Sequence, residues 1–199
     1  MLAVLPLCCF PPIHWCALAL KSEHVLIDIH EHYPKQTFRN RYEIPGANGK
    51  MVLTIPVVGQ KGQKIPFNEI QLADGNWRKQ HFLSLKSTYQ RSAFFEYYED
   101  EVKNIFSADQ KFLIGFNLDA LLFVENIFGK RISGQFTVEY IENFDVKDFR
   151  NEFEPSVQWT QLPTYPQVFG DRLGFVNNVS VLDLIFNLGP GARDYMINT

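Results

Sequence analysis

Apolar positions in the first part of this chain form short runs separated by prolines and polar residues. The runs Leu2–Leu7 and Val25–Ile29 are aliphatic and contain β-branched residues, a pattern typical of buried strands. Between them, Pro11–Pro12 predicts a turn and residues 13–20 a helix, because proline is favoured in the first turn of a helix. The pattern therefore predicts a short βαβ-like unit with neighbouring parallel strands and a right-handed crossover.

The rest of the pattern predicts a hairpin, a group of helices and several irregular segments. Residues 42–44 and 51–57 are expected to pair across a turn at Asn48–Gly49, since Asn-Gly supplies the positive φ that a tight turn needs. Further along, we expect a polar loop at 59–62, an irregular strand at 65–72, helices at 76–90, 94–105 and 109–128, a strand at 137–141, an extended loop at 162–169, and a helix at 180–187 that Gly189–Gly191 ends. We therefore expect an α/β fold with a single domain over residues 1–199: a mixed sheet opened by the βαβ-like unit and the hairpin, a helical cluster in the middle and a C-terminal helix.

The composition is that of a globular protein with an uneven charge distribution. Of the 199 residues, 46% are hydrophobic and 21% charged, which is not the composition of a disordered chain. The net charge is -3, but residues 1–95 carry 11 Lys and Arg against 6 Asp and Glu, whereas residues 96–199 carry 8 against 16. The basic half is therefore the place to look for an anionic ligand, and the overall acidity argues against a nucleic-acid partner.

The cysteines and the first apolar stretch bear on location. Cys8, Cys9 and Cys16 are odd in number and clustered, a usage that indicates a reducing compartment. No basic residue precedes the apolar part of residues 1–20 and Pro11–Pro12 interrupts it, so a strand, a turn and a helix are favoured over a signal peptide. No other stretch approaches the roughly 18 consecutive apolar residues of a membrane helix, so we expect a cytoplasmic protein without a membrane partner.

A polar run follows the strand Val25–Ile29, at the place where open α/β sheets usually bind their ligands. Within this run, Arg39 and Arg41 could hold a phosphate or carboxylate, with Asn40 orienting it and Lys35 adding a point charge. Strand alternation would send the two arginines to one face and Asn40 to the other. The structural alternative is that the arginines fasten the loop to Glu31 or Glu43.

Histidines supply the candidate proton-transfer groups. His30 and His32 would share one side of an extended segment, and an imidazole suits proton transfer at neutral pH. Metal binding by these two, completed by His14 or His81, lacks any HExxH or paired CxxC spacing, so we predict no metal site and favour surface or capping histidines over ligands. Trp77 and His81 share a helix face, where His81 either lines a pocket or is a packed histidine bonded to a carbonyl.

For three further features of the sequence, a structural interpretation is favoured. Cys9, just before a predicted helix, or Cys16 could act as a nucleophile, but a buried apolar cysteine is the favoured interpretation. Asp183 lies in an apolar helix, where an unpaired carboxylate would be costly, so we expect it to pair with an arginine or cap a backbone group. Gly189–Arg193 resembles a phosphate-binding loop only loosely, and a helix C-cap explains its glycines.

Six short motifs occur in an order that resembles the WbqC-like family. They are Pro11–Trp15, Lys35–Arg41, Leu53–Val57, Trp77-x-x-x-His81, Tyr165–Phe169 and Ser180-x-Leu182-Asp183-Leu184-x-Phe186-Asn187-x-Gly189-Pro190. The resemblance implies a bacterial protein of the short form of that family, some members of which lie among genes for surface polysaccharides such as O-antigen. It also implies transfer of an acyl or aminoacyl group onto an amino sugar. Pro6–Pro12 departs from the opening of longer members, where a Gln and a Tyr are usual.

We therefore expect a protein that binds an anionic small molecule, a nucleotide-linked or amino sugar, and transfers an acyl-type group. The expected catalytic residues are His30, His32 and His81, and the expected ligand-binding residues are His14, Lys35, Arg39, Asn40, Arg41 and Trp77. No motif identifies a cofactor or an oligomeric state. Two alternatives stay open: a nucleotidyltransferase-like enzyme with His14 over a triphosphate, and a non-catalytic partner in a polysaccharide pathway that uses the aromatic residues of 94–98 as an interface.

Overall fold

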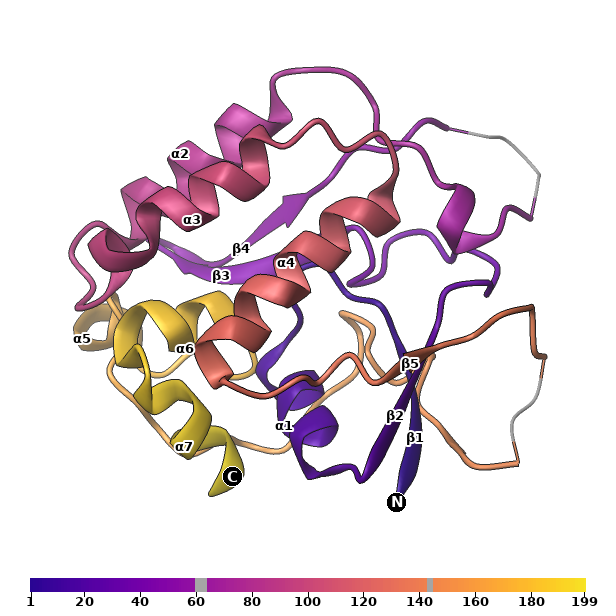
Figure 1. Ribbon diagram of the computed structural model, residues 1–199. Helices are drawn as coiled ribbons and strands as arrows, with labels where there is room; N and C mark the ends of the chain where they lie inside the picture. The colour runs from indigo at the N-terminus through magenta and orange to yellow at the C-terminus, as the bar shows by residue number, and fades with distance from the viewer. Residues whose placement is uncertain (60–63, 143–144) are drawn as a thin grey trace.

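The computed structural model describes residues 1–59, 64–142 and 145–199 and shows two sheets covered by helices (Figure 1). Strand β1 (Leu2–Pro6) pairs in parallel with β2 (His24–Asp28), and helix α1 (Ile13–Lys21) connects them. This confirms the predicted βαβ-like unit. Two short strands extend the sheet, so that β5 (Gln135–Phe136), β2, β1 and β6 (Lys147–Asp148) follow in that order, each parallel to its neighbour.

The predicted hairpin is present as a second, two-stranded sheet. Strand β3 (Arg41–Gly46) pairs antiparallel with β4 (Gly49–Thr54), in a register that places Arg41 opposite Thr54. The protein is therefore the α/β fold expected from the sequence, with four parallel strands and an antiparallel hairpin. Apart from Gly59, the polar loop expected at 59–62 lies outside the described residues.

Seven α-helices and one 3-10 helix are seen in the part of the chain that the structure describes. After α1 come the 3-10 helix η1 (Phe67–Glu69), α2 (Trp77–Tyr89), α3 (Phe95–Ser107), α4 (Leu113–Phe128), α5 (Gly170–Leu173), α6 (Val181–Leu188) and α7 (Gly191–Ile197). Helices α2 and α3 lie side by side over the hairpin, while α6 and α7 lie near α1 at the other end (Figure 1). No helix in these residues is long and apolar enough to cross a membrane.

Three local predictions need correction. The strand expected at 137–141 is instead β5, two residues earlier, and Val138 is 88% exposed. Gly134 allows this earlier pairing, because a Cβ there would lie 2.0 Å from the carbonyl oxygen of Val25. The irregular strand expected at 65–72 contains η1. Beyond the predicted helix end at Gly189, the chain forms a further helix, α7, with Pro190 at its N-cap position.

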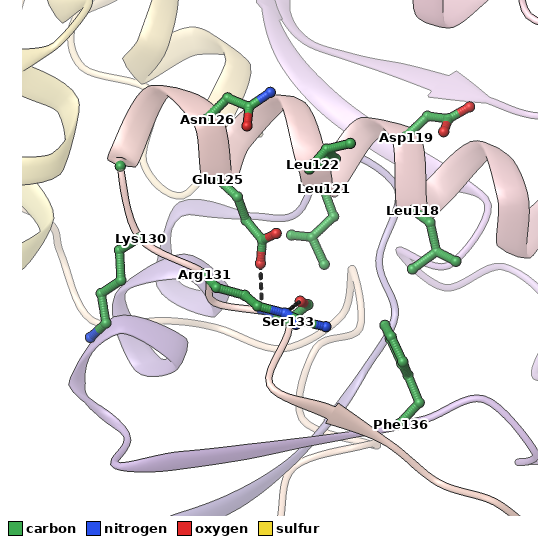
Figure 2. Close-up of a pocket in the computed structure, with 11 residues that line it drawn as sticks. Leu118, Asp119, Leu121, Leu122, Glu125, Asn126, Lys130, Arg131, Ser133 and Phe136 are labelled. Carbon is green, nitrogen blue, oxygen red and sulfur yellow. Dashed lines mark hydrogen bonds between the residues drawn. The ribbon is translucent and has the colours of Figure 1, made fainter.

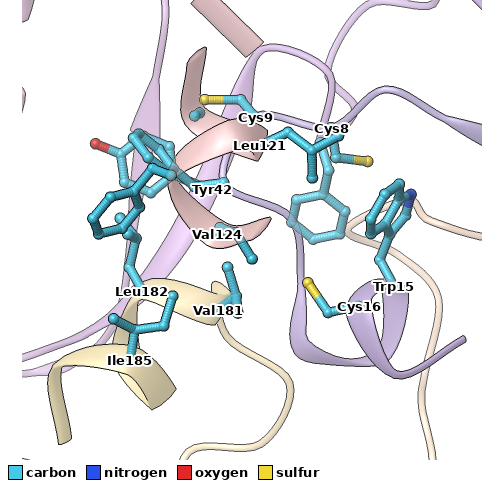
Figure 3. Packing of buried hydrophobic residues seen from close by; sticks show 14 of the residues in the cluster. Cys8, Cys9, Trp15, Cys16, Tyr42, Leu121, Val124, Val181, Leu182 and Ile185 are labelled. Carbon is cyan, nitrogen blue, oxygen red and sulfur yellow. The ribbon is translucent and has the colours of Figure 1, made fainter. Parts of the chain in front are cut away.

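One core joins the two sheets (Figure 3). Leu121 and Val124 of helix α4 belong to the same buried cluster as a group from the β1–α1 segment, β3 and α6. The labelled members of this group are Cys8, Cys9, Trp15, Cys16, Tyr42, Val181, Leu182 and Ile185, all less than 2% exposed. The three thiols are buried in this core, which raises their pKa values; that of Cys8 is about 12. The geometry thus favours the packing interpretation of the cysteines.

Candidate functional site

The carboxyl end of the parallel sheet carries a buried network of charges. Asp28, the last residue of β2, accepts hydrogen bonds from the Thr137 hydroxyl at 2.9 Å, from the His30 amide at 3.0 Å and from Arg150 Nη1 at 2.7 Å. Arg150 also binds Asp148, the last residue of β6, through Nη2 at 2.7 Å. Side chains at or just after the ends of β2, β5 and β6 therefore connect the ends of three parallel strands by hydrogen bonds and ion pairs.

Arg39 belongs to this network. Its Nε and Nη2 donate to the two carboxylate oxygens of Glu31, each at 2.6 Å, and Nη2 also donates to the Arg150 carbonyl at 3.0 Å. The side chain is 1% exposed, so a ligand in solvent has no direct access to it. This is the fastening role that the sequence left open for the arginines, and it separates Arg39 from Arg41.

Arg41, Asn40 and Lys35 line a shared pocket of about 410 Å³. The wall also includes Tyr33, Gln36, Thr54, Val57, Val58, Gly59, Ile65 and Ile70, and so contains two cations and no carboxylate among the described residues. The Arg41 Nε and the Asn40 Oδ1 are buried and have no hydrogen-bond partner among the described residues. Both atoms are closed off from solvent, so a ligand in the pocket would contact exposed Lys35 and the rest of the partly exposed Arg41 side chain.

The backbone explains how Asn40 and Arg41 come to line the same wall. The alternation expected for residues 39–41 does not hold, because Arg39 and Asn40 lie in a turn in which the Asn40 amide donates to the Thr37 carbonyl at 3.3 Å. Gln36 has φ of 62°, a left-handed conformation that costs energy for a residue with a side chain. Strain of this kind is held by the surrounding structure and is common at ligand sites.

His30 and His32 lie on the segment that connects β2 to this pocket. The His30 Nδ1 is 3.4 Å from Asn68 Nδ2, and the His32 ring stacks on Tyr140 with ring centroids 4.7 Å apart. His32 immediately precedes Tyr33, which lines the pocket and whose pKa burial raises to about 12. No group of three or more His, Cys, Asp or Glu able to hold a metal is found in residues 1–59, 64–142 and 145–199.

His81 and Trp77 lie in the core behind the hairpin. The Thr54 carbonyl can only accept a hydrogen bond, so His81 Nε2 donates to it at 3.2 Å, and Nδ1 accepts from the Tyr42 hydroxyl at 3.2 Å. Burial lowers the pKa of His81 to about 4. Trp77 packs edge-on against His81 and donates to the Ala73 carbonyl. Both ring nitrogens of His81 are thus engaged at neutral pH, which favours a packing role.

His14 lies apart from the pocket lining, on α1. Its ring stacks on Trp159 with centroids 4.9 Å apart, and Nε2 is 3.0 Å from the Thr160 carbonyl. Half-burial of the ring lowers its pKa. The aromatic residues considered as an interface are divided: Phe95 and Tyr98 are buried in the core, and Tyr97 is 77% exposed. Neither alternative function gains a specific contact from this arrangement.

One cluster that sequence reasoning missed joins two of the recognised motifs. Asp183 of α6 accepts hydrogen bonds from the Tyr165 hydroxyl at 2.5 Å and from Gln167 Nε2 at 2.8 Å, and Asn187 Nδ2 approaches it at 3.3 Å. Burial raises the pKa of Asp183 to about 6. The expected arginine partner is not among these contacts. The spacing Tyr-x-Gln, followed by an acid in an apolar helix, was the available signal.

A second cavity, of about 600 Å³, lies between α4 and the segment that leads to β5 (Figure 2). Two of its charged residues, Glu125 and Arg131, form hydrogen bonds to that segment. The Glu125 carboxylate accepts from the amides of Ile132 and Ser133, each at 2.7 Å, and Arg131 Nε donates to the Ser133 hydroxyl at 3.2 Å. Because the Glu125 carboxylate of this cavity is already bonded to two amides, the pocket of Lys35 and Arg41 is the stronger candidate for an anionic ligand.

Fold and site together define an α/β protein with a small cationic pocket beside the loop that follows its second parallel strand. The chain belongs to the WbqC-like protein family, whose family model matches residues 8–145 and 130–195. It is also similar to the uncharacterized protein Rv1507c of Mycobacterium tuberculosis. The two are 26% identical over an alignment of 212 residues, gaps included, which covers 90% of this chain and 89% of the relative. No solved structure matches the chain.

Proposed function

We propose that this WbqC-like protein binds an anionic small molecule in the pocket of Lys35 and Arg41 and transfers an acyl or aminoacyl group to an amino sugar for surface polysaccharide synthesis. The observation that carries the proposal is the pocket wall, which holds two cations and no carboxylate among the described residues. A guanidinium and an ammonium together suit a phosphate or carboxylate, and a nucleotide-linked sugar carries such a group.

The transfer step would use a histidine of the segment that leads to the pocket as the base. The sugar amine would attack the acyl carbonyl carbon, a C–N bond would form, and the leaving group would depart with the electrons of its bond to that carbon. The amine proton would pass to His30 or His32, which precede Tyr33 of the pocket wall. His81 is a weaker candidate, since both of its ring nitrogens are engaged and its pKa is about 4.

Ligand binding tests the site. Isothermal titration with acetyl phosphate and with pyrophosphate would be run on the wild type, on Arg41→Gln, and on Arg91→Gln as an exposed arginine control. A charge-assisted hydrogen bond contributes about 1.5–3 kcal/mol, so we expect Arg41→Gln to raise Kd at least about tenfold and Arg91→Gln to leave it unchanged. Equal affinity of the wild type and Arg41→Gln for both compounds would refute the pocket as the anion site.

The transfer reaction needs a separate measurement. UDP-glucosamine would be incubated with the protein and a panel of acyl donors (acyl phosphates, acyl thioesters and aminoacyl adenylates), and N-acylated product would be sought by mass spectrometry. We expect product with the wild type and a loss of at least about tenfold for the His30→Gln/His32→Gln double variant, the scale of general-base catalysis. Undiminished product formation by that variant would exclude these histidines as the base.

A further inference from the structure

The wall of the Lys35–Arg41 pocket is mostly apolar once its cations are set aside. The side chains concerned come from the loop after β2, from the segment after β4 and from both sides of η1; they are Tyr33, Val57, Val58, Ile65 and Ile70. Ile70 and Asn40 are more than 90% buried, so this part of the wall is fixed by the core. A ligand that places its anion on Lys35 and Arg41 would therefore place the atoms next to that anion against aliphatic surface.

Besides the two cations, the described side chains of the wall that can form hydrogen bonds are those of Tyr33, Gln36, Asn40 and Thr54. None of these four is a carboxylate. A hexose carries a hydroxyl on almost every carbon, and each hydroxyl loses free energy if it leaves water without a partner. Carboxylates accept such hydroxyls well, and none is found among the described residues of this wall. The wall thus fits an aliphatic body better than a sugar ring.

We infer that the pocket takes the acyl donor: a phosphate-bearing or carboxylate-bearing molecule with a compact aliphatic body. The inference rests on the proposed function and assigns one of its two substrates to this pocket, so that the amino sugar would bind outside it. The volume of about 410 Å³ leaves space for an anionic head and several carbon atoms. Tyr33 stacks on Phe67, with centroids 6.3 Å apart, so one of its faces is already used by the protein.

Three phosphate monoesters with the same anionic group separate the possibilities. Methyl phosphate, butyl phosphate and glucosamine 6-phosphate would be titrated calorimetrically into the wild type. Burial of a methylene contributes about 0.8 kcal/mol, or about fourfold in Kd, and a half-open pocket realises about half of that free energy. We therefore expect butyl phosphate to bind about tenfold more tightly than methyl phosphate, and glucosamine 6-phosphate no more tightly than methyl phosphate.

Two variants test which part of the pocket is responsible. Val57→Thr keeps the shape of a half-buried wall residue and makes it polar; we expect the butyl-to-methyl ratio to fall to about threefold with methyl phosphate unchanged. Arg41→Gln should weaken all three esters, and Arg91→Gln should weaken none. Tighter binding of glucosamine 6-phosphate than of butyl phosphate to the wild type would overturn the inference and leave the proposed anion site standing. If each ester bound the wild type and Arg41→Gln with the same Kd, both the inference and the proposed anion site would be overturned.

Discussion

His81 makes a stability prediction that follows from its contacts. The imidazole is buried, its two nitrogens are bonded to Tyr42 and to the Thr54 carbonyl, and its pKa is about 4 instead of 6.5. Below pH 6.5 the unfolded chain therefore binds a proton that the folded protein excludes, and stability is lost as the pH falls towards 4. The shift corresponds to about 3 kcal/mol in total, of which about 2 kcal/mol is lost between pH 7.5 and pH 5.

The measurement compares the wild type with His81→Gln, which retains a donor and an acceptor but does not titrate. Urea unfolding would be followed by tryptophan fluorescence at pH 7.5 and at pH 5, and each variant compared with itself. We expect the wild type to lose about 2 kcal/mol more than the variant over this interval, even if the variant is less stable at both pH values. Equal losses would refute the depressed pKa and restore His81 as a candidate base at neutral pH.

Three other predictions concern the free energy of unfolding. Asp183 has a raised pKa of about 6, so the stability that it contributes is present below about pH 4 and is lost as the pH rises through 6. In the wild type, the free energy of unfolding should therefore decline by about 3 kcal/mol, and Asp183→Asn should remove this decline. Parallel profiles of the two proteins in urea unfolding from pH 4 to 7 would contradict this. Arg39→Met and Glu31→Gln each leave a buried polar group without its partner. Each should lower the free energy of unfolding in urea by about 3–5 kcal/mol, and the double variant should lower it by less than the sum of the two. Additive effects would exclude a coupled pair. Gly134→Ala and Gly129→Ala introduce the same left-handed strain, at φ of 59° and 58°, but only at Gly134 does the new Cβ meet backbone at 2.0 Å. Thermal unfolding should show a loss of stability of about 1 kcal/mol for Gly129→Ala and a clearly larger loss for Gly134→Ala. Equal losses would refute the close approach at Gly134.

Local signals were enough to predict the elements that are long or strongly punctuated. The β1–α1–β2 unit, the hairpin around Asn48–Gly49 and the three central helices depend on residues close in sequence: aliphatic runs, a proline turn and 3.6-residue periodicity. The strands β5 and β6 are two residues long and pair with β2 and β1 from more than 100 residues away. No periodicity exists in two residues, so their positions could not be predicted from the pattern.

In the polar run after β2, too, the sequence predicts some features and leaves others to the tertiary structure. Its composition and position correctly marked it as a cluster of charged groups at the end of a buried strand, and Lys35, Asn40 and Arg41 do line one pocket. The sequence could not separate Arg41 from Arg39, two residues earlier. Which of the two arginines is buried depends on a turn at 37–40 and on Glu31 and Arg150, which bind Arg39 and exclude solvent from it.

The sequence by itself therefore determined which segments form the early strands and helices, the family and the region that carries the cationic groups. Tertiary structure alone decided which of those groups are available. Burial and hydrogen-bond partners set the protonation and access of a side chain, and the partners of Arg39, His81 and Asp183 come from other segments of the chain. Identical residue types thus become a structural ion pair at Arg39 and a pocket cation at Arg41, because only one of them was enclosed when the sheet ends came together.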